Sequence, residues 1–237
     1  MKKSIYLLGD IHGNYNTITY WLGGVHHRDC HLIQVGDFGI GFRDPEREHI
    51  LMDSLNEKLK EKNVILYAIR GNHDDPDCFR LKQYEKSNIH FLDDYSVLEL
   101  EGHKILLAGG AISIDRTVRK RDNPPSWFPG EVFVLDVEKL SSYRDIDIVV
   151  THTAPTFCNP VGWNQLVHDW ADMDPGLHHE LPKERMMLTE MHDILIKENK
   201  IKKWFYGHFH FSKKEKHGDV EFQLLAINEF KELETKR

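Results

Sequence analysis

Five short apolar runs in this chain each end in a motif built from glycine, aspartate, asparagine, threonine or histidine. The runs cover residues 4–8, 31–35, 64–69, 146–150 and 203–206. Their length and their β-branched or apolar residues predict buried strands. The motifs that follow read GDIHGN from Gly9, GDFG from Gly36, GNHD from Gly71, THT from Thr151 and GHFH from Gly207. Because open α/β sheets place their sites at the carboxyl ends of strands, these motifs are expected to meet in one site.

Helical patterns separate the first three predicted strands. They cover residues 14–22, 45–62 and 76–86, with Asn14 and Asp75 as predicted N-caps. This alternation predicts crossover connections and a parallel sheet. The pattern then changes to short strands joined by tight turns, at residues 89–92, 95–100 and 104–108, and again at 204–206, 211–215 and 220–227. These later strands are expected to form antiparallel hairpins.

The chain has 237 residues, and residues 1–237 are expected to form a single domain with one full-sized core. Two segments, at about 112–131 and 157–185, interrupt the regular pattern and are predicted to be insertions. Both leave the ends of predicted core strands, so they are candidates for the walls of a substrate pocket. Within the second insertion, Trp163 and Trp170 are expected to pack locally, and His168, His178 and His179 to be exposed.

Composition narrows the class of protein. The formal net charge of −7 disfavours a body built to grip nucleic acid, although it leaves a local basic patch open. Cys30, Cys78 and Cys158 are scattered and odd in number, which indicates reduced thiols and a cytoplasmic location. No apolar stretch approaches the ~20 residues of a membrane span, so no membrane partner is expected.

The residues in the five motifs suit a centre of two divalent metal ions. Such a centre needs a carboxylate that can bridge the ions, together with other oxygen and imidazole donors. Asp10 and His12 are two residues apart at a strand end, and Asp37 directly closes the next strand, which makes it the candidate bridge. The full set of candidate ligands is Asp10, His12, Asp37, Asn72, His152, His208 and His210.

The ordered motifs, spanning residues 9–210, resemble the calcineurin-like metallophosphoesterase superfamily. The resemblance implies a four-layer α/β/β/α sandwich, in which two mixed sheets are flanked by helices. It implies that Asp10, His12, Asp37 and His210 hold one metal, and that Asp37, Asn72, His152 and His208 hold the second. It also implies that His73 protonates the leaving group or steadies the phosphate. Manganese is the expected metal, with iron, zinc, cobalt or nickel as alternatives.

The second motif departs from the phosphatase branches of that superfamily, which continue it as Gly-Asp-x-x-Asp-Arg-Gly. Ile40 stands where an aspartate would orient the catalytic histidine, and Gly41 stands where an arginine would bind phosphate. Asp74 or Asp115 is therefore expected to orient His73. Arg70 does match those branches.

The missing phosphate arginine needs a replacement, and the segment 115–121 offers candidates. Arg116 and Arg119 are expected to bind substrate phosphate, because arginine suits bidentate contact with phosphate oxygens. A solvated loop is the alternative for these residues. The segment around Ser113, Arg119 and Trp127 also resembles a bacterial and phage branch of the superfamily.

The resulting hypothesis is a hydrolase that cleaves phosphate esters with a metal-bound hydroxide as the attacking nucleophile. Its substrate could be a phosphorylated small molecule, a nucleotide or a phosphoprotein, and the sequence leaves the oligomeric state open. A nuclease or nucleotide phosphodiesterase on the same scaffold is the first alternative. A scaffold protein that binds metal without catalysis is the second.

Overall fold

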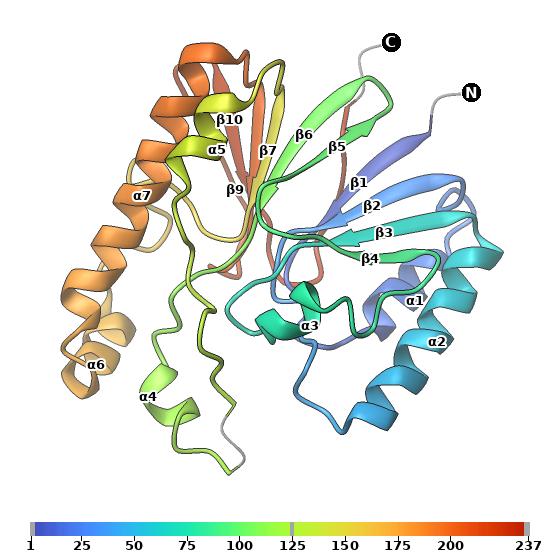
Figure 1. Cartoon of the computed structure of the whole chain (residues 1–237), viewed down its shortest axis with the longest axis horizontal. Coiled ribbons are helices and arrows are strands. Elements are labelled where there is room, and N and C mark those ends of the chain that lie inside the picture. Colours follow the sequence, from blue (N-terminus) through green and yellow to red (C-terminus); the bar gives the residue numbers. More distant parts are fainter. Residues whose placement is uncertain (1–2, 124–125, 235–237) are drawn as a thin grey trace.

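The computed structural model describes residues 3–123 and 126–234, and Figure 1 shows two β-sheets between helices. The predicted domain limits at residues 1 and 237 lie outside the described residues, as do Pro124 and Pro125 of the first predicted insertion.

The first sheet has the strand order β11-β1-β2-β3-β4. Its strands are β1 (Ser4–Leu8), β2 (Cys30–Gln34), β3 (Val64–Ala68), β4 (Ile89–Phe91) and β11 (Phe230–Glu232). The parallel pairing predicted for β1, β2 and β3 is confirmed. The antiparallel pairing expected for β4 is wrong, because β4 extends the sheet parallel to β3. At the other edge, β11 pairs antiparallel with β1.

The second sheet has the order β5-β6-β7-β8-β10-β9. Its strands are β5 (Ser96–Leu100), β6 (His103–Ala108), β7 (Ile148–Thr151), β8 (Lys203–Tyr206), β9 (Lys213–His217) and β10 (Val220–Leu224). The hairpins β5–β6 and β9–β10 are antiparallel as predicted. The hairpin expected to start at β8 is wrong, because β8 pairs parallel with both β7 and β10.

Side-chain caps start the helices that follow β2 and β3. Asp75 caps α3 (Pro76–Arg80) as predicted, and Asp44 caps α2 (Pro45–Glu61) in the same way, each before a proline. The prediction of Asn14 as an N-cap is wrong, because α1 (Asn16–Leu22) begins two residues later and has Tyr15 at the N-cap position, without a side-chain cap. The helix α3 is shorter than expected, and Lys82, with φ of +53°, turns the chain away from the helical path.

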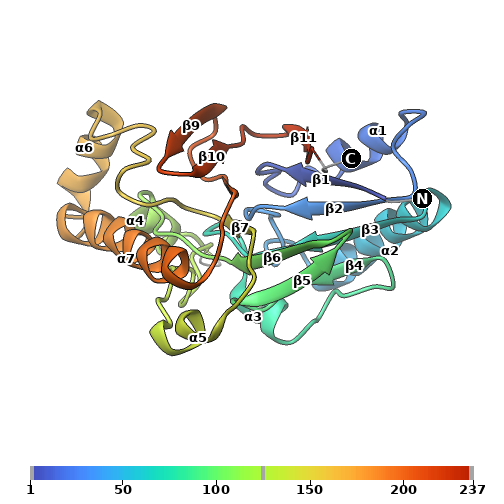
Figure 2. The ribbon, with the colours of Figure 1, turned by 90° about the horizontal axis from the view of Figure 1, so that it is seen from above.

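Apolar side chains fill three layers of core, which makes the fold a four-layer sandwich. The inner layer joins the two sheets and includes Ile33 and Val35 from the first sheet and Val150 and Phe205 from the second. The outer layers seat α2 and α7 (Leu177–Glu198) through residues with the same three- and four-residue spacing, namely Met52, Leu55 and Leu59, and Leu188, Met191 and Leu195. The predicted α/β/β/α architecture is confirmed (Figure 2).

The two predicted insertions contain helices. The first includes α4 (Arg116–Arg119), and the second includes α6 (Gln165–Met173) and the first turns of α7. Between them, α5 (Val137–Ser142) packs beside α7 against the second sheet. None of the helices in residues 3–123 and 126–234 combines the length and the apolar character needed to cross a bilayer.

Candidate metal centre

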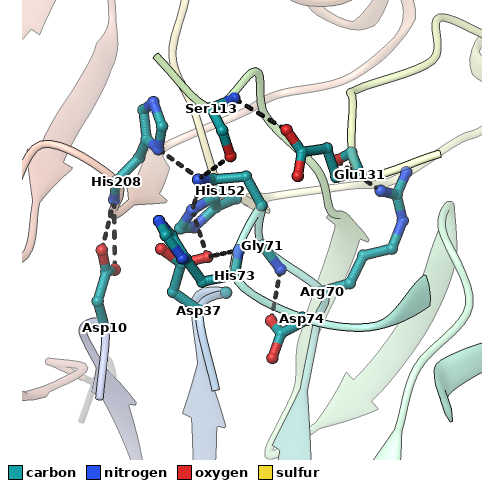
Figure 3. A network of polar contacts seen from close by, with 12 residues as sticks. Asp10, Asp37, Arg70, Gly71, His73, Asp74, Ser113, Glu131, His152 and His208 are labelled. Atoms are coloured by element: carbon teal, nitrogen blue, oxygen red, sulfur yellow. Dashed lines mark hydrogen bonds and ion pairs between the residues drawn. The ribbon is translucent and has the colours of Figure 1, made fainter. Parts of the chain in front are cut away.

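The five motifs meet where the carboxyl ends of strands from both sheets converge. Asp10, Asp37 and Asn72 follow β1, β2 and β3 in the first sheet, whereas His152 and His208 follow β7 and β8 in the second. Figure 3 shows Asp10, Asp37, His152 and His208 gathered in this place. The site therefore draws its donors from both halves of the sandwich.

One group of donors consists of Asp10, His12, Asp37 and His210. The Nε2 atoms of His12 and His210 lie 3.0 Å apart, and His210 Nε2 lies 3.3 Å from Asp10 Oδ2. His12 Nε2 lies 3.7 Å from Asp37 Oδ2. The candidate ligand atoms of the group all lie within 4.8 Å of one another, a spacing that one ion could satisfy.

A second group forms on the other side of Asp37. His152 Nε2 lies 3.2 Å from Asp37 Oδ1 and 3.1 Å from Asn72 Oδ1. His208 Nδ1 lies 2.8 Å from the same Asn72 oxygen. All the residues that the sequence nominates as ligands are thus brought together, and Asp37 is common to both groups.

Asp37 gives an independent test of whether metals fit here. Its Oδ1 accepts a hydrogen bond of 2.7 Å from the His73 amide, while its buried Oδ2 has no hydrogen-bond partner among the described residues. Leaving a buried carboxylate oxygen unpaired is unfavourable unless a charge or an ion meets it. A carboxylate with one oxygen toward each donor group suits a bridging ligand of mixed oxygen and nitrogen sites.

Neighbouring groups fix which atoms of the candidate ligands face the centre. The amide of Asn72 donates from Nδ2 to Ser113 Oγ at 2.9 Å, so its Oδ1 must point toward the histidines. His152 Nδ1 lies 2.9 Å from the carbonyl oxygen of Val35 and donates to it, which leaves Nε2 as the metal-binding atom. These contacts hold the donors in place before any ion binds.

The backbone at the centre is held in a conformation that most residues avoid. His12, Asp37, His208 and His210 have φ values of +45°, +57°, +71° and +65°. The left-handed region is unfavourable for residues with a Cβ, and such strain concentrates at functional sites. The glycines before Asp37 and His208 make room for neighbouring donors: a Cβ on Gly36 would lie 2.3 Å from His152 Nδ1, and a Cβ on Gly207 would lie 2.1 Å from Asp10 Oδ1. The tight turns therefore serve the placement of donors.

Burial and neighbouring charges have opposite effects on the pKa values of the residues in the centre. Burial disfavours the charged form of His152, but the adjacent Asp37 carboxylate outweighs it and raises the pKa of His152 to about 9. Burial also opposes ionisation of Asp37, yet His152 holds the pKa of that carboxyl well below its usual range. A hydrogen bond to Asp10 raises the pKa of His210. His152 and His210 therefore hold protons more tightly than ordinary histidines, whereas burial lowers the pKa of His208. Metal ions would compete with protons for the atoms of His152 and His210.

A hollow of about 600 Å³ opens directly beside these donors. Asp37, Asn72 and His208 line its inner end, and residues of both predicted insertions, among them Asp115 and Trp163, line the rest. Both segments thus lie where a substrate pocket would need walls. The volume is within the range of small-molecule sites.

Two charged residues that sequence reasoning missed also line the hollow, namely Glu184 and Arg185 of α7. Arg185 donates to the carbonyl oxygens of Ala154, Pro155 and Cys158, and its guanidinium lies 5.4 Å from the centre of the Phe209 ring. It thereby ties the loop after β7 to the GHFH loop. Both residues sit in the second predicted insertion or at its end, and no local motif marks them.

Glu184 gives the protein a pH-dependent stability that can be measured. Burial raises the pKa of the Glu184 carboxyl to about 8, and its Oε1 is unpaired in the described structure. An unfolded glutamate ionises near pH ~4.3, so the folded protein holds an extra proton between these values and loses stability as the pH rises through this window. Glu184→Gln should therefore be more stable than the parent by roughly 2–5 kcal/mol at pH 8.5 and nearly equal to it at pH 4.5.

Urea unfolding of the metal-free protein at both pH values measures this difference. Glu190→Gln, an exposed position on the same helix, serves as the control and should follow the parent at both pH values. Equal stabilities of the parent and Glu184→Gln at pH 8.5 would contradict the pKa given for Glu184.

A profile of the family described as calcineurin-like phosphoesterase matches residues 3–212. The chain belongs to this family. It is a hydrolase of a metal-dependent class, as the sequence motifs imply. No curated protein sequence gives a significant match.

Solved structures support the fold. The phosphopantetheinyl hydrolase PptH from Mycobacterium tuberculosis is 13% identical, with a TM-score of 0.54, covering 96% of this chain and 90% of that one. GAP50, the anchor in the inner membrane complex of Plasmodium, is 12% identical, with a TM-score of 0.51, covering 95% of this chain and 72% of that one. At such low identities, these likenesses establish the architecture alone.

His73, the residue to which the family resemblance gives the proton or phosphate role, lies at the rim of the two donor groups. Its ring centre is 5.1 Å from that of His12, and it lines the hollow. Burial lowers the pKa of the His73 imidazole, partly offset by Asp37. The His73 ring therefore lies, by its distance to His12 and its place in the lining, beside both the candidate metal ligands and the space for a substrate.

The expectation that Asp74 orients His73 is wrong. The two oxygens of Asp74 accept hydrogen bonds from the backbone N–H groups of Phe38, Gly39, Ile40 and Gly71, at 2.6–3.1 Å. Asp74 therefore joins the second motif to the third. Asp115 raises the pKa of His73 through its charge, but no hydrogen bond joins the two within the described residues.

The departures from the phosphatase branches of the family have a steric explanation. Ile40 is fully buried in the outer core of the first sheet. Gly41 has a φ of +91°, and a Cβ there would lie 2.4 Å from Asp75 Cβ, so an arginine could not occupy this position without displacing α3. Arg70 binds Asp94 and the carbonyl oxygens of residues 130–132, which is a structural task.

The contacts of Arg116 and Arg119 do not support the phosphate-binding role expected for them. Arg116 is paired with Asp174 and Glu180. Arg119 is buried and donates to Ser113, Ser126 and the Asn72 carbonyl oxygen, with Glu131 3.3 Å away. Both guanidinium groups are therefore already engaged by protein groups. The partners Asp174, Glu180 and Asn72 lie 58, 64 and 47 residues away along the chain, which a local sequence pattern does not reveal. Arg119 instead supports Ser113, which orients Asn72.

Replacing Arg119 with alanine should loosen the centre. Its loss leaves the buried Glu131 carboxylate without its cation, and we expect destabilisation by roughly 3–5 kcal/mol. Weakened support of Asn72 should also lower metal affinity by ~10–100-fold. Urea unfolding and metal titration measure the two effects. Arg121→Ala, an exposed control in the same segment, should change neither, and normal metal affinity in Arg119→Ala would refute the positioning role.

Proposed function

We propose that this protein hydrolyses phosphate esters with two divalent metal ions held between its sheets. The observation that carries the proposal is Asp37, which belongs to both donor groups and keeps one buried oxygen without a hydrogen-bond partner among the described residues. Asp10, His12 and His210 would complete one site. Asn72, His152 and His208 would complete the other, as their distances support.

Two ions in these sites would supply an activated water and would neutralise charge on the reacting phosphate. The protein's own side chains would protonate the leaving group and bind the phosphate. His73, at the rim of the donor groups, would donate a proton to the leaving oxygen or a hydrogen bond to the phosphate.

Arg185 is the proposed phosphate cation, in place of Arg116 and Arg119. It lines the same hollow as Asp37 and His208, and its Nη1 has no hydrogen-bond partner in the described part of the chain. A guanidinium held by backbone carbonyls and an aromatic ring is ordered before substrate arrives, which favours charge stabilisation in the transition state.

Arg185→Ala should lower kcat/KM by at least ~10-fold, equivalent to about 1.4 kcal/mol, because one cation near the phosphate is lost. The inhibition constant of inorganic phosphate should rise by a similar factor, while metal content stays unchanged. Steady-state kinetics with phosphate inhibition measure both. Lys183→Ala, an exposed position on the same helix, is the matched control. Unchanged phosphate inhibition would remove Arg185 from the site.

Manganese is the proposed metal, with iron, zinc, cobalt and nickel as the alternatives, since the mixed carboxylate, amide and imidazole donors suit these ions. The proposed substrate is a phosphorylated small molecule, nucleotide or protein. The cytoplasm is the proposed location, supported by the free, buried Cys30, Cys78 and Cys158.

The decisive experiment loads metal-free protein with manganese and offers it a panel of esters. The panel contains p-nitrophenyl phosphate, bis-p-nitrophenyl phosphate, cyclic nucleotides and single-stranded DNA. Uptake of two equivalents with hydrolysis of the small esters is expected. A preference for DNA would favour the nuclease alternative, and metal uptake without hydrolysis of any ester would favour a scaffold. Binding of one equivalent under excess metal would end the two-metal proposal.

A further inference from the structure

The hollow beside the candidate metal centre is far larger than a phosphate group requires. Its volume is about 600 Å³, and its inner end is lined by Asp37, Asn72 and His208. The space continues outward between the loop after β7 and the helices α6 and α7. A phosphate at the metals would leave most of this volume for the rest of the substrate.

The outer wall is apolar and unusually exposed. Val161, Trp163 and Leu166 line it and are 38%, 41% and 58% exposed. Trp170 and Leu181 continue the wall into the small apolar cluster around Leu177. Apolar side chains left open in a concave site, next to polar reacting groups, are typical of a binding subsite for an organic ligand.

The wall is also pre-organised. The indole of Trp163 stacks on the His178 imidazole, with ring centres 5.0 Å apart and planes 10° from parallel. Asn164 caps α6 by accepting a hydrogen bond of 3.0 Å from the Val167 amide, which fixes the start of the helix beside Trp163. A ring held in this way can contact a ligand with little loss of side-chain freedom.

Charge limits what this wall can accept. The lining residues between 159 and 182 carry no charged side chain in the described structure, whereas the charged groups Asp115, Glu184 and Arg185 lie elsewhere in the lining. Asn159 and Asn164 are polar side chains in this part of the lining, and each uses its Oδ1 to accept from a backbone amide. A sugar or peptide bearing many polar groups would lose more hydrogen bonds to water than these two side chains could replace. An uncharged group with a broad apolar face would gain by burial.

We propose that the outer wall, formed around Trp163 and Leu166, is a subsite for an uncharged aromatic or similarly apolar group carried by the phosphate ester. The substrate class is thus a phosphate ester of a bulky apolar alcohol. This inference rests on the proposed hydrolase function for the direction in which the phosphate points. The subsite itself is a property of the hollow.

The first test compares 2-phenylethyl phosphate with ethyl phosphate on the manganese-loaded protein. Both esters have primary alcohols as leaving groups, so their intrinsic reactivity is similar and the ratio of kcat/KM reports on the added ring. We expect a ratio of about 70, from burial of roughly 100 Å² of apolar surface at ~25 cal/mol per Å². Trp163→Ala and Leu166→Ala should each reduce the ratio at least ~5-fold.

Met186→Ala is the matched control, because Met186 is 64% exposed on α7 and lies outside the lining of the hollow. It should keep the ratio of the parent. If Trp163→Ala fails to fold, Leu166→Ala carries the test, since Leu166 is the more exposed of the two. A ratio near one in the parent, or a higher kcat/KM for glucose 6-phosphate or a phosphopeptide than for 2-phenylethyl phosphate, would overturn the subsite.

A binding measurement separates this inference from the proposed function. Calorimetry with 2-phenylethylphosphonate and ethylphosphonate, which cannot be hydrolysed, should give the same preference and the same loss in the two variants. If no ester is cleaved but the phosphonate preference appears, the hydrolase proposal fails and the subsite stands. If esters are cleaved without any preference in either assay, the subsite fails alone.

Discussion

Asp37→Asn should abolish metal binding at both donor groups and lower kcat/KM by at least ~10³-fold, about 4 kcal/mol of transition-state stabilisation. Asp37 is the residue common to both groups, so its change affects both candidate sites. In addition, an amide cannot supply the negative charge that holds two cations close together. Inductively coupled plasma spectrometry of the purified variant measures the metal, and steady-state kinetics measure the turnover.

The control for this change is Asp77→Asn, which alters an exposed carboxylate on α3 that pairs with Arg80 at the surface. It should retain full metal content and activity. A variant at position 37 that still binds two equivalents and turns over at the parental rate would refute the bridging role of Asp37.

His73→Ala should reduce turnover by ~10²–10⁴-fold while leaving the metal content intact. The backbone amide of His73 donates to Asp37, and alanine keeps this N–H, so the donor groups should persist. If His73 acts as the proton donor, the loss should be larger for alkyl phosphates than for p-nitrophenyl phosphate, whose leaving group needs little protonation.

Kinetics with both types of ester measure this contrast, with the exposed His26→Ala as the control. Loss of metal together with activity would make His73 a structural support of the centre. An equal loss with both esters would leave it a phosphate-binding group, and an unaffected rate with alkyl phosphates would remove it from the mechanism.

The parts of the fold and site that the sequence predicts are local. Each motif lies within a few residues of the strand that carries it. The hydrophobic pattern of the strands, the turn residues after them and the order of the motifs along the chain are therefore enough to identify Asp10 or His208 as candidate ligands. The direction of β4 was beyond such reasoning, because a strand of three residues takes its orientation from the neighbour with which it pairs.

The roles of arginines depended on tertiary contacts in the same way. Arg116 finds its carboxylates 58 and 64 residues further along the chain, and Arg185 reaches back to carbonyl oxygens of the loop after β7. A pattern of charges in one loop therefore identifies cations but cannot say which of them is already paired. Only the folded chain separates Arg119, which is buried and bonded, from Arg185, which lines the hollow.

The donors of the first group span almost the whole chain, since His12 and His210 are 198 positions apart. A ribosome-bound chain that has not yet released residues 207–210 lacks part of each candidate site, however well its first sheet has formed. Metal binding at both candidate sites therefore requires that residues 207–210 have left the ribosome. Cells short of the metal would accumulate a folded chain whose two sheets are joined by their apolar layer and by contacts such as that of His152 with the Val35 carbonyl oxygen, without the further tie of bound ions.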